Sequence, residues 1–157
     1  MNNLIIFYSR TGNTKQLAEL ISQQGNWKFE EIIDTKKRKG IIGFLKSGYE
    51  ATRKKLTIIK ELEKNPALFD SLILGTPIWN KRMSTPIRTF IVQNKSKMKK
   101  IAFFCTEGSK GGFKTFENMA ELCGMQPTAT LEITKQDIKN DLHLNKVKNF
   151  VQEISSN

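Results

Sequence analysis

Only two cysteines and one histidine occur among the 157 residues. Cys105 and Cys123 are 18 positions apart, so they form no CxxC redox pair, and with a single histidine they assemble no Cys/His zinc site. A chain of this length buries enough of its surface to form a core without disulfides or metals. We therefore expect both thiols to be reduced and buried.

Long apolar stretches are also missing. No run approaches the ~18 apolar residues that span a bilayer, and no charged segment followed by an apolar one opens the chain as in a secretion signal. Proline (4) and glycine (10) are sparse, and 38% of the residues are hydrophobic, which excludes collagen-like and disordered chains. We expect one domain spanning residues 1–157, located in the cytoplasm.

Acidic residues are few compared with basic ones. The 15 Asp and Glu stand against 26 Lys and Arg, which gives a net charge of +11 and a pI near 9.7. Such a charge attracts anions over a long range, and nucleic acid, acidic protein, anionic lipid and a phosphorylated cofactor all fit. A basic protein with none of these partners fits as well, so charge alone does not identify the partner.

Five short apolar segments alternate with segments of helical periodicity. The expected strands are 4–8, 27–33, 68–74, 100–105 and 129–133, and the expected helices are 15–25, 36–55, 86–92, 113–122 and 138–154. The third strand is expected to end at Gly75, because Pro77 cannot continue a central ladder. In segment 36–55, one helical face carries Ile41, Phe44, Leu45, Gly48, Tyr49 and Thr52, and basic runs flank it at 36–39 and 53–55.

Apolar strands that alternate with helices predict an α/β fold in which a parallel sheet is covered on both faces. The class is a doubly wound three-layer α/β/α sandwich with a five-stranded parallel sheet. In such sheets ligands lie outside the carboxyl ends of the strands. The loops that matter are therefore 9–14, 75–80 and 105–113.

The first of these loops has the chemistry of an anion site. Ser9, Thr11 and Thr14 offer hydroxyls, Asn13 offers an amide, and Gly12 lets backbone N–H groups approach a ligand at the start of a helix. The loop contains neither GxxxxGK[ST] nor GxGxxG, so ATP and NAD are disfavoured. An ordinary helix cap formed by Thr11 or Asn13 is the alternative.

The other two loops combine aromatic residues with glycine. Trp79 follows the third strand, where an indole either covers a flat ligand or caps the sheet edge. The loop from Cys105 to Phe113 contains three glycines together with polar side chains, and its alternative interpretation is a flexible turn.

The chain lacks residues that several classes of protein require for their chemistry. Receiver domains share this fold but need carboxylates after the first strand, and residues 4–14 contain none. Low-molecular-weight phosphatases place an arginine six positions after their cysteine, where Gly111 follows Cys105. A serine nucleophile needs a histidine base, and the single histidine, His143, is expected to face solvent on the last helix.

The loops together, above all Ser9-Arg10-Thr11-Gly12-Asn13-Thr14 and Gly75-Thr76-Pro77-Ile78-Trp79-Asn80, resemble those of the flavodoxins and their FMN-binding relatives. The resemblance covers nearly the whole chain in element order and implies the strand order 2-1-3-4-5. It implies FMN as the cofactor, with the phosphate on Ser9, Thr11, Asn13 and Thr14 and the ring beside Trp79. No catalytic acid or base and no metal are implied, since the flavin carries the redox chemistry.

The full cofactor-binding set that the resemblance implies is Ser9, Arg10, Thr11, Gly12, Asn13, Thr14, Thr76, Pro77, Ile78, Trp79, Asn80, Thr106, Glu107, Gly108, Gly111, Gly112 and Phe113. Arg10 occupies a position that the family fills variably. Phe113 is the nearest match to a tyrosine that often covers the outer ring face. The Gly-Gly form of this loop also resembles a branch of the family in which that face is open.

The basic charge departs from electron-transfer flavodoxins, which are usually strongly acidic around the flavin. Here Lys81, Arg82 and Lys110 stand against Glu107. An acidic redox protein or an anionic small acceptor is therefore the expected partner.

Three functions remain open. The first is electron transfer, and the second is an FMN-dependent NAD(P)H reductase of quinones or other small acceptors. The third is a scaffold without flavin that binds an acidic protein or nucleic acid. Nucleic acid is disfavoured because no aromatic RNA-binding motif lies among the basic runs.

Overall fold

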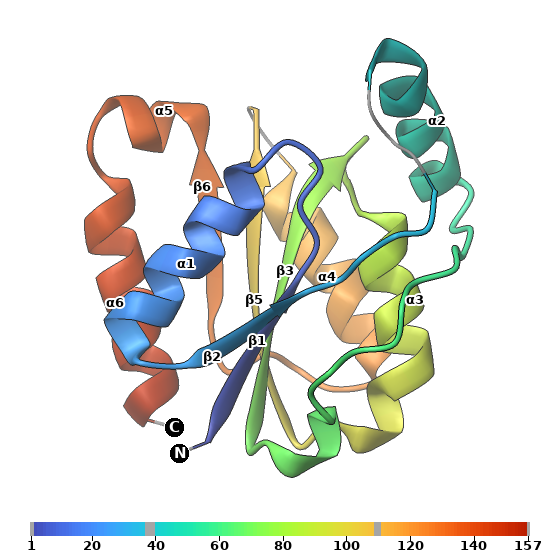
Figure 1. The fold of residues 1–157 in the computed structure, drawn as a ribbon. Helices are drawn as coiled ribbons and strands as arrows, with labels where there is room; N and C mark the ends of the chain where they lie inside the picture. The colour runs from blue at the N-terminus through green and yellow to red at the C-terminus, as the bar shows by residue number, and fades with distance from the viewer. Residues whose placement is uncertain (1, 37–39, 109–110, 157) are drawn as a thin grey trace.

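The computed structural model describes residues 2–36, 40–108 and 111–156, in which a sheet lies between two layers of helices (Figure 1). The strands are β1 (Asn3–Phe7), β2 (Lys28–Glu31), β3 (Ser71–Trp79), β4 (Arg82–Met83), β5 (Lys100–Glu107) and β6 (Thr130–Thr134). The helices are α1 (Asn13–Gly25), α2 (Gly40–Thr52), α3 (Thr85–Asn94), α4 (Gly112–Cys123), α5 (Lys135–Lys139) and α6 (His143–Ser156). Short 3₁₀ turns occupy Pro66–Leu68 and Lys95–Lys97.

The main strands are parallel and follow the order β2-β1-β3-β5-β6, which confirms the predicted doubly wound topology. Leu4 of β1 pairs with Lys28 of β2 on one side and with Leu72 of β3 on the other. Strands are thus added on one side of β1 first and then, from β3 onward, on its other side. The carboxyl ends of these two strands form the switch point at which ligands bind in such folds.

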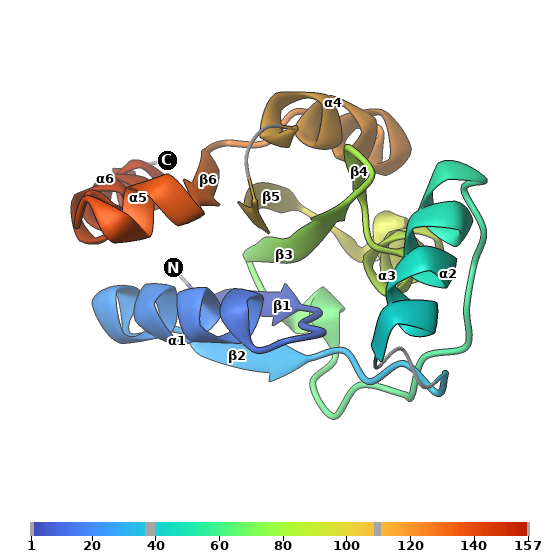
Figure 2. The same ribbon diagram turned by 90° about the horizontal axis from the view of Figure 1, so that it is seen from above.

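Alternate residues of β1 supply the two halves of the core. Leu4 and Ile6 pack in the cluster that includes α3 and α4, whereas Ile5 and Phe7 pack in the cluster that includes α1 and α6. Figure 2 shows these two layers on opposite sides of the sheet. All four side chains are fully buried, and each contributes about 1.5–3 kcal/mol through removal from water.

The prediction that β3 ends before Pro77 is wrong. The strand continues to Trp79, and Pro77 pairs with Thr106 of β5. The carbonyl of Gly75 accepts a hydrogen bond from the N–H of Tyr8, so the backbone groups of Gly75, and two residues later those of Pro77, face the β1 side. Pro77 has no backbone N–H to donate to a strand on that side. Because β1 ends at Phe7, no hydrogen bond of the sheet is lost.

Beyond Trp79 the chain forms a tight hairpin rather than the predicted open loop. β4 pairs antiparallel with the end of β3, joining Trp79 to Arg82. Asn80 and Lys81 have φ values of 49° and 59°, as in the two-residue turns that match the twist of a hairpin. The hairpin therefore fixes where Trp79 lies.

The predicted second crossover helix is confirmed as α2, but it is shorter than 36–55 and residues 37–39 of the basic run lie outside the described residues. The predicted apolar face points outward in part, because Leu45 is 65% exposed and Tyr49 is 54% exposed. Ser47 and Glu50 are buried instead. Arg53 lies 5.6 Å from the centre of the Tyr49 ring, a cation–π distance that suits an exposed aromatic residue.

The predicted last helix, 138–154, is interrupted and forms two helices. Thr134 and Asp137 form a capping box that starts α5, with the Asp137 N–H donating to Thr134 Oγ1 over 3.1 Å. Asp141 adopts a φ of 55°, which ends that helical path before α6 begins at His143. The break brings the start of α6 to the carboxyl ends of the strands (Figure 1).

Candidate functional site

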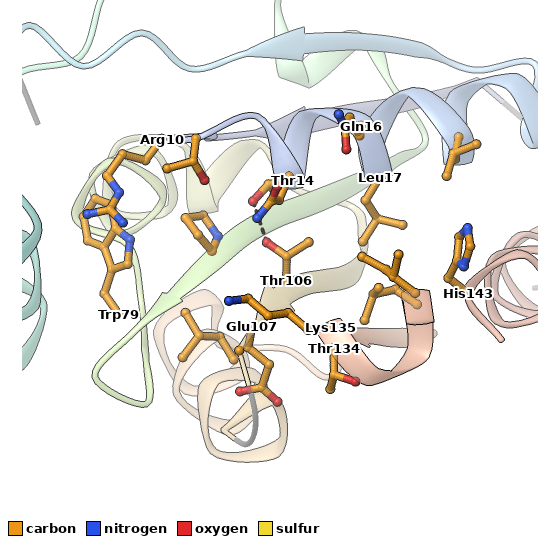
Figure 3. Close-up of a pocket in the computed structure, with 18 residues that line it drawn as sticks. Arg10, Thr14, Gln16, Leu17, Trp79, Thr106, Glu107, Thr134, Lys135 and His143 are labelled. Atoms are coloured by element: carbon orange, nitrogen blue, oxygen red, sulfur yellow. Dashed lines mark hydrogen bonds between the residues drawn. The ribbon is translucent and has the colours of Figure 1, made fainter. Parts of the chain in front are cut away.

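A cavity of about 630 Å³ opens at the carboxyl ends of β3, β5 and β6, next to the first two turns of α1 (Figure 3). This volume lies within the range of small-molecule and cofactor sites. Its lining residues come from the loop 10–14, α1, the end of β3, the end of β5, the end of β6, α5 and the start of α6. The switch point of the sheet therefore holds a real cavity.

One wall of the cavity is the N-terminal end of α1. Gly12 precedes the helix with a φ of 97°, a left-handed conformation that glycine adopts without strain, and no side chain caps the helix. The first turn also contains no acidic residue. Free backbone N–H groups and the positive end of a 13-residue helix therefore face the cavity beside Thr11 and Asn13.

Ser9 and Thr14 hold this loop in place. Ser9 Oγ accepts a hydrogen bond from the Gly12 N–H over 3.1 Å. Thr14 Oγ1 lies 2.7 Å from Thr106 Oγ1, a hydrogen bond between α1 and β5 that Figure 3 shows at the centre of the cavity. Thr14 and Thr106 both line the cavity.

Trp79 forms the cavity wall on the side of the hairpin. Its indole is 5% exposed and packs edge-on against the Tyr8 ring, with 5.6 Å between the ring centres. Pro77 and Ile78 line the same wall. A rigid aromatic surface thus stands opposite the residues that β5 contributes (Figure 3).

Glu107 stands at the end of β5, where its carboxyl group meets that of Glu132 from β6. The start of α4 packs closely against both carboxyl groups, since a Cβ on Gly111 would come within 3.2 Å of Glu107 Oε2 and one on Gly112 within 2.5 Å of Glu132. The Gly112 N–H donates to Glu132 Oε1 over 3.0 Å. Burial, followed by the hydrogen bond and charge of Glu132, raises the pKa of Glu107 to about 8. The protonated form of Glu107 is therefore favoured at neutral pH.

The structure brings most of the predicted cofactor-binding residues to this cavity. Those that line it are Arg10, Thr11, Asn13, Thr14, Pro77, Ile78, Trp79, Thr106, Glu107 and Gly108. Ser9 and Gly12 lie just behind the lining and shape the loop.

The remaining predicted residues lie elsewhere. Thr76 is buried, and its hydroxyl donates to Ser84 Oγ and accepts from the Ser84 N–H at the start of α3. Asn80 is in the hairpin turn and donates to Thr52 of α2 over 2.8 Å. Gly111 and Gly112 pack against the two carboxyl groups at the start of α4.

Phe113, the predicted partner for the outer ring face, is 75% exposed and lines a different hollow of about 380 Å³ between α4, β6 and α6. Ser109 and Lys110 lie outside the described residues.

The sequence reasoning missed one end of the cavity. The additional lining residues are Gln16, Leu17, Leu20, Ile133, Thr134, Lys135, Ile138 and His143. His143 was expected to face solvent, but it is half-buried and its Nδ1 atom is buried without a hydrogen-bond partner. Only the break between α5 and α6 brings it there, so the helical periodicity held no signal for this position.

The two cysteines take no part in the cavity. Both are buried and free, as expected. Burial raises the pKa of the Cys105 thiol well above its usual value and that of Cys123 to about 12, so neither thiol is a nucleophile at neutral pH. Within the described residues, no three metal-ligating side chains come together and no helix has the length and apolarity needed to cross a membrane.

Comparison with known proteins finds similarity in structure but not in sequence. No protein-family model matches the chain, and no curated protein matches it. A flavoprotein from Lactobacillus acidophilus, crystallised in complex with FMN, superposes with a TM-score of 0.74 at 20% identity, covering 90% of this chain and 97% of that one.

Two further structures show the same arrangement. Oxidised flavodoxin 2 from Bacillus cereus gives a TM-score of 0.60 at 17% identity, over 99% of each chain. The flavodoxin, WrbA-like protein from Agrobacterium tumefaciens gives 0.59 at 15% identity, over 96% of this chain and 95% of that one. The protein has the flavodoxin-like fold.

Proposed function

We propose that the protein binds one FMN in this cavity and acts in electron transfer. The observation that carries the proposal is the uncapped N-terminal end of α1, which shares one cavity with the buried indole of Trp79. An anion site and an aromatic wall in one cavity suit a ligand with a phosphate at one end and a flat ring at the other.

The residues that line the cavity fit both the phosphate and the ring of FMN. Thr11, Asn13 and Thr14, together with the free N–H groups of the first turn of α1, would hold the phosphate. Trp79 would lie beside the ring, and the backbone of Glu107 and Gly108 would follow its polar edge. Bound FMN would supply the redox chemistry, while the protein binds it, orients it and excludes water.

The flavoprotein from Lactobacillus acidophilus supports the proposal, because that protein has a similar fold and was crystallised with FMN bound. The basic side chains near the cavity support an acidic partner. Lys81 and Arg82 belong to the hairpin that carries Trp79, and Arg10 lines the cavity. Long-range attraction would speed docking of an acidic redox protein or an anionic acceptor.

A second candidate is an FMN-dependent reductase of small acceptors. It is favoured by the end of the cavity near Lys135 and His143, which the proposed flavin position leaves available. A steady-state assay with NADPH and a quinone distinguishes the two. Turnover with both substrates supports the reductase, whereas a bound flavin without turnover supports the carrier.

Titration of the protein with FMN, followed by flavin fluorescence, tests the binding proposal. Thr11→Ala removes a hydrogen bond to a charged phosphate, worth about 1.5–3 kcal/mol, so FMN should bind about ten- to a hundredfold more weakly. Riboflavin, which lacks the phosphate, should bind parent and variant equally. Thr130→Ala is the matched control, because Thr130 is exposed on β6 outside the cavity.

An FMN affinity that is unchanged by Thr11→Ala would place the phosphate elsewhere. An absence of flavin binding by the parent would leave the flavin-free scaffold as the better description.

A further inference from the structure

The cavity extends well beyond the part that FMN is proposed to occupy. Leu20 lines the cavity seven residues after Asn13 on α1, which places it about 10 Å further along the helix axis. The proposed ring wall, Trp79, lies at the end away from His143, and Thr14 of the proposed phosphate site lies between the two ends (Figure 3). The end between α1, β6 and α5 is therefore unassigned.

This end of the cavity has aliphatic walls. Leu17 and Ile133 are buried, and Leu20 and Ile138 complete the lining from α1 and α5. Ile138 is 52% exposed, which is unusual for a large apolar side chain beside a cavity. Water gains few hydrogen bonds against such walls, so an apolar ligand surface is favoured there.

Two polar groups border this end, and neither has a partner of its own among the described residues: the Lys135 ammonium group lies toward Thr106 at the centre of the cavity, and His143 lies at the far end (Figure 3). Lys135 extends from the start of α5 across the cavity, and no hydrogen bond or ion pair ties its ammonium group to the described chain (Figure 3). His143 Nδ1 is buried and unbonded on the far side of the aliphatic walls.

We propose that this end of the cavity, bounded by Leu17, Leu20, Lys135, Ile138 and His143, binds a small apolar carboxylate of the size of an aromatic acid. The carboxylate pairs with the Lys135 ammonium group in a charge-assisted hydrogen bond. The apolar body lies against the aliphatic walls and reaches the imidazole of His143. The net charge of +11 raises the local concentration of any such anion.

The site does not depend on the proposed flavin function. It uses Lys135 of α5, His143 of α6 and the second turn of α1, whereas the proposed FMN phosphate depends on Thr11 and the first turn of α1. The Thr11→Ala variant should therefore weaken FMN binding and leave carboxylate binding unchanged. This separates a failure of one proposal from a failure of the other.

Isothermal titration calorimetry with 1-naphthoate, and with the uncharged 1-naphthamide, tests the site. The parent should bind one naphthoate per chain. Lys135→Gln should weaken naphthoate about tenfold or more through loss of the charged partner, while naphthamide should bind both proteins equally. Lys139→Gln is the matched control, since Lys139 lies on the same short helix, is exposed and is not part of the cavity lining.

His143 provides an independent readout because it is the only histidine in the chain, so its ring resonances in an NMR spectrum are unambiguous. Naphthoate should shift these resonances in the parent and, at the same ligand concentration, less in Lys135→Gln. Leu20→Asn should weaken both naphthoate and naphthamide, with its thermal unfolding checked to exclude a loss of the fold.

Naphthoate that binds without moving the His143 resonances, or equally well in Lys135→Gln, would overturn the proposal. So would an absence of binding in a correctly folded parent.

Discussion

Replacing Glu107 by glutamine tests whether this side chain carries a proton at neutral pH. Burial and the neighbouring Glu132 raise the pKa of Glu107 to about 8, compared with the usual carboxyl range near 4.5 in an unfolded chain. Glutamine has nearly the same shape as a protonated glutamate and also donates a hydrogen bond, but it does not titrate. The variant should therefore behave like the parent at low pH and differ from it at high pH.

The direction in which the free energy of unfolding changes with pH follows from proton binding. Between pH values of about 4.5 and 8, folded Glu107 keeps a proton that the unfolded chain has released, so the free energy of unfolding falls as pH rises through this window. A whole proton would give about 1.4 kcal/mol per pH unit. The side chain is only half-buried and solvent screens it, so we expect a total loss of about 1–2 kcal/mol.

The assay is urea unfolding of parent and Glu107→Gln at about pH 5 and about pH 8, without flavin, followed by circular dichroism. Asp137 has a lowered pKa, so its effect on the free energy of unfolding has the opposite dependence on pH. Its stabilising contribution is lost only as pH falls below about 4, outside this window. Glu61→Gln is the control, because Glu61 is an exposed loop residue.

The variant should gain about 1–2 kcal/mol over the parent between the two pH values, while Glu61→Gln should follow the parent. A difference between parent and Glu107→Gln that stays constant from pH 5 to pH 8 would show that Glu107 is ionised throughout.

Three further predictions concern the site and its support. If FMN binds beside Trp79, the fluorescence of Trp79 should be strongly quenched when FMN binds, while that of Trp27 should not. Trp79→Phe should therefore remove most of the quenching of tryptophan fluorescence. Gly75→Ala should destabilise the protein by about 1–3 kcal/mol in urea unfolding, because a Cβ there would lie 2.0 Å from the Phe104 ring; an unchanged midpoint would refute this. Asp137→Asn should cost about 0.5–2 kcal/mol above pH 5, since it weakens the capping box and the 2.7 Å ion pair to Lys146, and this cost should shrink as acid protonates Asp137 in the parent; a cost that does not change with pH would argue against the ion pair.

The parallel sheet was predictable from the sequence because its signals are local, whereas the strand order was implied by the resemblance to the flavodoxins. Leu4–Tyr8 and residues 100–105 are apolar runs too short for helices, and the helical segments between them impose parallel pairing. The loop 9–14 could also be singled out from the sequence, since a glycine among hydroxyl and amide side chains at a helix start is typical of an anion site as well as of a helix cap. These features need no knowledge of distant residues.

The end of the third strand and the pairing of the two carboxyl groups were not predictable, because each depends on a neighbour that is remote in sequence. Pro77 fits within β3 only because β1 stops at Phe7, which leaves its nitrogen without a ladder partner. Glu107 and Glu132 are ordinary surface residues in the sequence. Their strands pair as neighbours, and the two glycines at 111 and 112 close over them.

The sequence by itself thus determined the alternation of main strands and helices and the loop that is proposed to bind phosphate, since periodicity and turn chemistry act over a few residues. Tertiary structure alone decided which side chains share the cavity. His143 reaches it only because the chain breaks between α5 and α6, and Phe113 misses it because α4 begins by turning that ring toward α6. Positions of this kind are set by packing between distant elements, which no local pattern records.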